Sequence, residues 1–178
     1  MAYAAWSVTF GEQPSAAKWN ILGTNDASFN DGTGIGTNAI AAASLKTNAI
    51  KLGYAAITAD VSTASTTVVA ATGLSVTVTV PSGSRSIKIT AYIAGTYNSS
   101  TNQCRLSIWD GTVGSGTQIA AAFNGNASGQ IVPATMMAVA TPSAGSKTYN
   151  VGYYGSGAGT TYITGATTGP SFILVEAI

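Results

Sequence analysis

Apolar and hydroxyl-bearing residues begin to alternate strictly near residue 60, and this pattern recurs to the end of the chain. In segment 74–80, LSVTVTV, Leu and Val occupy every second position, with Ser and Thr between them. The short sequence PSGS separates this run from a second alternating run at 87–93. A period of two is typical of half-buried strands, and the connecting turn predicts that these two form a hairpin-like pair.

Further segments of the same kind follow at a spacing of about ten residues. Cys104, Leu106 and Ile108 share one face of a predicted strand, which Asp110 and Gly111 close as a turn. Later strands are predicted at 117–123, 131–140, 147–154, 160–164 and 171–178. Many short strands with regular turns predict an all-β fold, an antiparallel sandwich of the jelly-roll type.

The last predicted strand, SFILVEAI at 171–178, is apolar on both of its faces. A strand with two apolar faces must be covered on both. In a two-layer sandwich one face meets the internal core, and a neighbouring subunit is the simplest cover for the other. The predicted subunit interface therefore consists of Phe172, Ile173, Leu174, Val175 and Ile178.

Two segments precede the alternating region, which we place at 58–178. Residues 1–38 form a predicted attachment segment, with a short helix at 15–22 that Gly23 ends. Residues 39–57 are rich in Ala and form a predicted connector, either a short helix or extended chain packed on the main domain, or a three-stranded stalk.

Composition narrows the class of protein. Charged residues make up 7% of the chain and the formal net charge is +1, so a nucleic-acid partner is not expected. Ala, Gly, Ser and Thr supply over half of the 178 residues, which suits strands, turns and a neutral hydroxyl surface. No segment has the length of apolar sequence that membrane insertion requires, and the N-terminus lacks the pattern of a signal peptide.

The reactive side chains argue against catalysis. The chain has no histidine, which removes the common nucleophilic triads and the usual neutral-pH general base. Cys104 is interpreted as a small core residue beside Leu106 and Ile108. Nothing in the sequence pairs two carboxyl groups as a glycosidase needs. The six acids are Glu12, Asp26, Asp31, Asp60, Asp110 and Glu176.

Two predicted loops, at 26–31 and 32–36, have features of calcium-binding and phosphate-binding loops respectively. Asp26, Ser28 and Asn30 have the spacing of the first calcium-loop ligands, but Asp31 stands at the glycine position and Thr37 at the glutamate position. The glycine-rich run at 32–36 lacks the Lys-Ser/Thr end of a phosphate loop. We therefore expect turns in both places, and no metal or other cofactor.

Aromatic and amide side chains in the alternating region are candidates for contact with a sugar, although the same residue types also fill cores and interfaces. The candidate ligand contacts are Tyr97, Asn98, Trp109, Asn124 and Tyr154.

The stretch FGEQPSAAKWN at 10–20 resembles the opening segment of many phage tail proteins. It departs from the usual pattern at Gln13 and Pro14, where a Leu-like residue is common, and at Trp19, where Met is common. The resemblance implies docking of the segment to other virion proteins. The residues assigned to this attachment are Phe10, Gly11, Glu12, Trp19, Asn20 and Phe29.

From residue 58 onward, the Val/Thr strand, the Trp-Asp-Gly turn and the closing SFILVE are similar to the tumour-necrosis-factor/C1q-like jelly rolls that end phage fibres. The resemblance implies a homotrimer with the last strand near the threefold axis. The expected function is that of a phage tail-fibre or receptor-binding protein, located on the virion, that adheres to a host surface glycan. A capsid decoration or head-fibre protein and a free lectin-like module are the alternatives.

Overall fold

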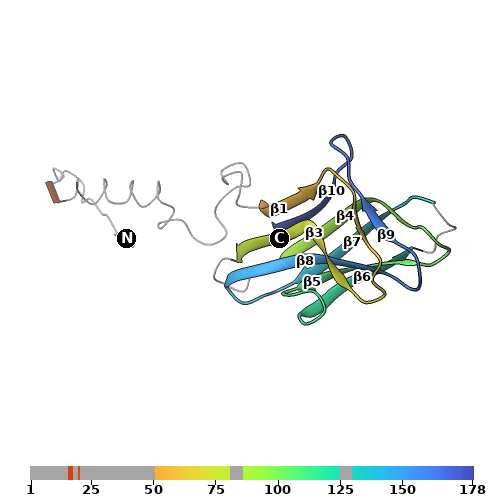
Figure 1. Cartoon of the computed structure of the whole chain (residues 1–178). Helices are drawn as coiled ribbons and strands as arrows, with labels where there is room; N and C mark the ends of the chain where they lie inside the picture. The colour runs from red at the N-terminus through yellow and green to blue at the C-terminus, as the bar shows by residue number, and fades with distance from the viewer. Residues whose placement is uncertain (1–15, 18–19, 21–50, 81–85, 125–129) are drawn as a thin grey trace. The chain divides into compact units, whose positions relative to one another are not determined.

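The structure is a computed structural model that describes residues 16–17, 20, 51–80, 86–124 and 130–178. The chain divides into two units, 1–46 and 47–178, and the second contains all the strands of the described part (Figure 1). In the first unit the described residues Ala16, Ala17 and Asn20 are helical, as predicted for 15–22. The predicted attachment residues other than Asn20 lie outside the described residues.

The described residues of the second unit form ten strands in two antiparallel sheets. The strands are β1 (Lys51–Ile57), β2 (Val61–Thr63), β3 (Val69–Val80), β4 (Ile87–Asn98), β5 (Cys104–Asp110), β6 (Thr117–Asn124), β7 (Val132–Ala140), β8 (Gly145–Gly155), β9 (Thr161–Thr164) and β10 (Ser171–Ala177).

One sheet has the order β1-β10-β4-β7, and the other has the order β3-β8-β5-β6. In the first sheet β9 pairs with the second half of β4, next to β10, and β2 pairs with β9. The chain crosses between the sheets from β2 to β3, from β3 to β4, from β4 to β5, from β6 to β7, from β7 to β8 and from β8 to β9. A six-stranded and a four-stranded layer linked in this way form a jelly roll, which confirms the predicted all-β sandwich.

The alternation predicted for β3 is confirmed residue by residue. Val76, Val78 and Val80 are buried, while the Ser and Thr residues between them are exposed. The predicted pairing of this strand with β4 is wrong, because β3 pairs with β8 and β4 pairs with β10 and β7. A short connection alone cannot distinguish a hairpin from a crossing between two packed layers.

In the C-terminal part of the predicted connector 39–57 the chain is extended and packs on the main domain, one of the alternatives that the sequence left open. Residues 51–57 form β1, which pairs with β10 from Lys51–Glu176 to Ile57–Ser171. Residues 39–50 lie outside the described residues.

The core lies between the two layers and is built from alternate residues of each strand. Ile89 and Ile173 of the first sheet and Leu106 and Val151 of the second are within the same buried cluster. Cys104 is fully buried as well, and burial raises the pKa of its thiol. This placement confirms that Cys104 is a core residue.

Tyr149 is fully buried, and its hydroxyl has no hydrogen-bond partner among the described residues. Burial, with a smaller contribution from the charge of Asp110, raises the pKa of Tyr149 to about 12 from 10.0. The unfolded chain thus releases this proton at a lower pH than the folded chain does, so the free energy of unfolding should fall as pH rises from about 10.

We predict that Tyr149→Phe reduces this alkaline loss and raises stability at neutral pH by about 1 kcal/mol, because it removes a buried hydroxyl without a partner. Urea unfolding at pH 8 and at several values above 10 measures both effects. Tyr153 remains as a second buried phenol with a raised pKa, so part of the alkaline loss should persist. If the free energy of unfolding of Tyr149→Phe falls above pH 10 as steeply as that of the unmodified protein, the prediction is contradicted.

Candidate interaction surfaces

The two faces of β10 have different neighbours. Ile173 and Val175 are fully buried and point into the core between the sheets, whereas Phe172 and Leu174 are only half-buried and lie on the outer side. Ile178, just beyond the strand, is 57% exposed. Of the five predicted interface residues, Ile173 and Val175 are covered within the chain, and Phe172, Leu174 and Ile178 keep exposed surface.

An aromatic row crosses the outer side of this sheet. Phe172 lies between Tyr54 of β1 and Tyr92 of β4, with ring centroids 5.6 Å and 5.5 Å away and both pairs tilted. The register places Ala56 and Tyr92 directly opposite Phe172 on either side, and Tyr54 opposite Leu174. Tilted aromatic pairs at these distances are favourable and hold the three rings in a fixed arrangement.

The same surface continues across β4 to β7. Met137 is 63% exposed and lies opposite Thr90, and Val139 is 61% exposed and lies opposite Lys88. We call this surface the apolar face. It comprises Tyr54, Tyr92, Met137, Val139, Phe172 and Leu174.

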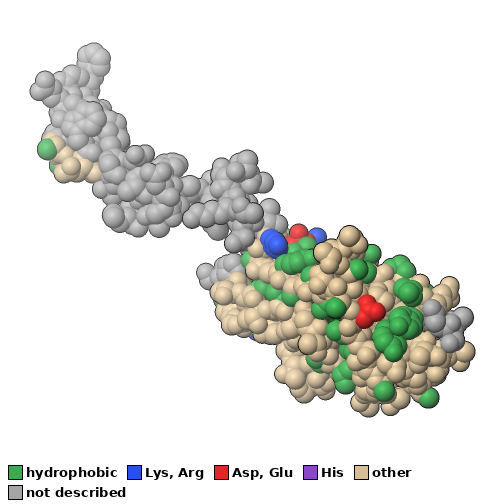
Figure 2. All heavy atoms as spheres, turned by 45° about the horizontal axis from the view of Figure 1, so that its top comes forward, with side chains coloured by type: hydrophobic (Ala, Val, Ile, Leu, Met, Phe, Trp, Pro, Cys, Tyr) green, Lys and Arg blue, Asp and Glu red, His purple; other side chains and the backbone are tan. Residues whose placement is uncertain are grey.

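One end of the apolar face carries Lys51, Lys88 and Glu176, and the Nζ of Lys51 lies 4.7 Å from the centre of the Tyr54 ring. Lys88 Nζ lies 2.7 Å from a carboxylate oxygen of Glu176, its partner across β4 and β10. Figure 2, which brings β1 and β10 toward the viewer, shows hydrophobic side chains over this side and only small groups of charged ones.

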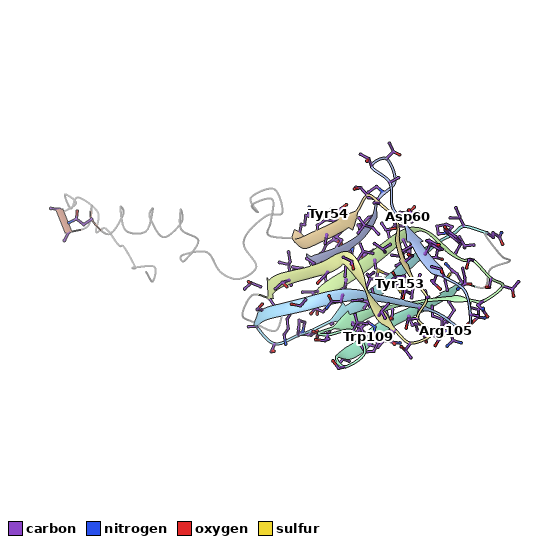
Figure 3. The ribbon with its side chains drawn as sticks, viewed as in Figure 1. Tyr54, Asp60, Arg105, Trp109 and Tyr153 are labelled. Atoms are coloured by element: carbon purple, nitrogen blue, oxygen red, sulfur yellow. The ribbon has the colours of Figure 1, made fainter. Side chains whose placement is uncertain are left out.

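The outer side of the β3-β8-β5-β6 sheet has a different character. Its β3 positions are Ser75, Thr77 and Thr79, all exposed, and the Thr77 and Thr148 hydroxyl oxygens are 2.8 Å apart. This confirms the neutral hydroxyl surface expected from composition. In Figure 3, Trp109 and Arg105 lie on the opposite side of the sandwich from Tyr54.

The predicted ligand contacts do not form one site. Tyr97 stacks on Tyr162 at the β9 end of the first sheet, with ring centroids 4.4 Å apart and planes inclined by 6°. Asn98 is fully buried and donates a 2.8 Å hydrogen bond to the Thr161 hydroxyl, so it is a structural residue. Asn124 donates to the Thr96 hydroxyl at 2.9 Å.

Trp109 and Tyr154 are the two candidates that lie on the same outer surface, on β5 and β8. The Trp109 indole N–H donates a 2.7 Å hydrogen bond to the Ser107 hydroxyl. It covers the backbone at Gly152, where an added Cβ would lie 2.9 Å from the indole nitrogen. The side chains of Val68 and Val113 would lie equally close to that Cβ, so a larger residue at 152 would force this packing to shift.

Two residues of this surface were not among the predicted contacts, Arg105 and Phe123. Arg105 alternates with the buried Cys104 and Leu106, so its outward position could have been predicted from the strand period. The side chains next to Arg105 could not have been predicted, because the sequence of β5 does not indicate its register with β6 and β8.

The described acids are dispersed. Asp60 accepts a hydrogen bond from the Gly165 amide at 3.0 Å, Asp110 ends β5, and Glu176 pairs with Lys88. Within the described part of the chain, no three metal-ligating side chains come together. Nor does any described helix have the length and apolar character needed to cross a bilayer. The loops at 26–31 and 32–36 lie outside the described residues.

No protein-family model matches the sequence, and no curated protein matches it. Among solved structures, the chain is similar to one described as "Structure of Eiger TNF from S. frugiperda". The TM-score is 0.44 and the identity 10%, over 72% of this chain and 93% of that chain. The assignment of the jelly roll rests on the strand order described above.

Proposed function

We propose that this chain is a self-associating structural protein and that its apolar face is the surface through which copies pack together. The observation that carries the proposal is the row of apolar side chains on the outer side of the β1-β10-β4-β7 sheet, where Tyr54, Met137 and Val139 are 45%, 63% and 61% exposed. Contiguous exposed apolar side chains with a polar rim mark interaction sites.

The proposed partner is another copy of the same chain. The apolar face carries few charges, the Lys88–Glu176 ion pair and Lys51 at one end, so most of it matches an equally apolar surface. Three copies are proposed because residues 58–178 are similar in sequence pattern to trimeric jelly rolls. In such a trimer the hydroxyl-bearing sheets would face outward.

We further propose that the trimer is part of a phage virion, as a tail-fibre or receptor-binding component. This rests on the resemblance of residues 10–20 to the opening of phage tail proteins, with 1–38 as the docking segment. Adhesion and assembly, rather than catalysis, fit a chain without histidine in which the three described acids lie on separate parts of the fold.

Immunogold electron microscopy of intact phage particles tests the location. Label at the tail tip or fibres is the expected result. Label over the shell would overturn the tail location in favour of a capsid decoration protein. The absence of label from particles, with the protein free in the lysate, would overturn the virion role and favour a free lectin-like module.

A further inference from the structure

Three side chains form a row across the outer surface of the β3-β8-β5-β6 sheet. Arg105 of β5 lies directly opposite Phe123 of β6 on one side and directly opposite Tyr154 of β8 on the other. Directly opposite residues in adjacent strands point to the same side and have neighbouring Cβ atoms. The sheet register therefore fixes a guanidinium between two aromatic rings.

The contacts agree with the register. The central carbon of the Arg105 guanidinium lies 5.2 Å from the centre of the Phe123 ring and 5.9 Å from that of Tyr154. Both distances fall in the range of cation–π attraction, which holds the charge in place. Phe123 is nevertheless 61% exposed, so most of its ring is available to a ligand.

Arg105 also has hydrogen-bonding capacity that the described residues do not use. Its Nε atom is buried and has no hydrogen-bond partner, and no ion pair joins it to a carboxylate of the described residues. A buried polar atom without a partner is costly, which is why such atoms are rare. The planar fork of a guanidinium matches the two oxygens of a carboxylate.

Other side chains on the same surface indicate which kind of molecule would bear the carboxylate that binds Arg105. Trp109 lies four residues further along β5 on the same surface, about 13 Å away along the strand. Hydroxyls of β3 and β8 lie further along this sheet, including those of Thr77 and Thr148, and Thr148 is six residues, about 20 Å, along β8 from Tyr154. Aromatic rings that can pack on sugar rings, together with neutral hydrogen-bonding groups, suit a saccharide better than a highly charged polymer.

We propose that the Phe123–Arg105–Tyr154 row binds an acidic saccharide, with the sugar carboxylate on the Arg105 guanidinium and a sugar ring against Phe123. This inference rests on the proposed function in that a host surface glycan is the ligand. The row lies on the surface that the proposed trimer leaves outward, so three copies would act together on one polymer.

The test uses the full chain and a tetrasaccharide of alternating glucuronate and N-acetylglucosamine, with titration calorimetry or saturation-transfer NMR as the measurement. The same tetrasaccharide with its carboxyls reduced to alcohols is the neutral comparison, and inorganic phosphate is the simple anion. We expect the acidic tetrasaccharide to bind at least about tenfold more tightly than either, because a charge-assisted bidentate contact contributes that much.

The variants locate the site. Arg105→Gln and Phe123→Ala should each weaken binding of the acidic tetrasaccharide about tenfold or more. Arg105→Lys should weaken it as well, because it keeps the charge but loses the fork. Lys147→Gln removes the same charge from β8 and should leave binding unchanged. Thermal unfolding of each variant identifies any loss that comes from misfolding.

Equal binding of the neutral tetrasaccharide, equal binding of phosphate, or an equal loss in Lys147→Gln would each overturn the acidic-saccharide site. The outcome is separable from that of the proposed function. A chain that forms trimers but binds no acidic saccharide overturns only this inference. A chain that stays monomeric yet binds through Arg105 overturns only the assembly.

Discussion

Met137→Lys is expected to convert the protein from a trimer into a monomer. Met137 is 63% exposed in the isolated chain, so the substitution leaves the core of the sandwich intact. In the assembled protein, the apolar face would bury the new ammonium without a partner, at a cost of about 3 kcal/mol or more. That corresponds to a roughly hundredfold or greater loss in the association constant, which sedimentation velocity measures.

Thr77→Lys is the matched control, because it adds the same charge to an exposed strand position on the other sheet. This variant should remain trimeric. If Met137→Lys stays trimeric as well, the apolar face is not the interface. If both variants become monomeric, added charge rather than its position would be responsible.

Ile173→Ala is expected to lower the free energy of unfolding by about 2–5 kcal/mol, because it leaves a cavity in a well-packed core. Its neighbour Leu174→Ala should have a much smaller effect on folding, since Leu174 is only half-buried within the chain. Urea unfolding in the Met137→Lys background measures both values without a contribution from assembly.

The two substitutions should have the opposite order of effect on assembly. Leu174→Ala removes part of the apolar face and should weaken trimer formation, while Ile173→Ala leaves that surface unchanged. If Leu174→Ala destabilises the monomer as much as Ile173→Ala does, the assignment of the two faces of β10 is incorrect.

The strand pattern could be predicted because it depends on local sequence. Leu74, Val76 and Val78 alternate with hydroxyl residues, and any sheet that buries one side of this segment buries those three. The doubly apolar character of β10 was also evident, although the sequence alone does not say which side faces the core. Ile173 and Val175 take the inner side because β10 pairs with β4 in the register that aligns Val175 with Ile89.

The arrangement of strands could not be predicted in the same way. Whether 74–80 pairs with 87–93 or crosses to the other layer depends on distant strands that compete for the same edges. Likewise, the sequence of the connector 39–57 leaves a short helix and extended chain open, and residues 51–57 pair as extended chain with the edge of β10. Pairing between segments far apart in sequence decided both cases.

The same limit applies to the surfaces. Tyr54, Phe172 and Tyr92 are far apart in sequence, and they meet because β1, β10 and β4 are neighbours. The row around Arg105 forms for the same reason from β6, β5 and β8. Residue type identified aromatic candidates, but only the register could say which of them lie together.

The mass of the unmodified protein in solution tests the central claim most directly. Sedimentation equilibrium over a range of concentrations should give three times the 17.7 kDa mass of one chain. A mass of one chain at every concentration would contradict self-association through the apolar face, and a stable dimer would contradict the threefold arrangement.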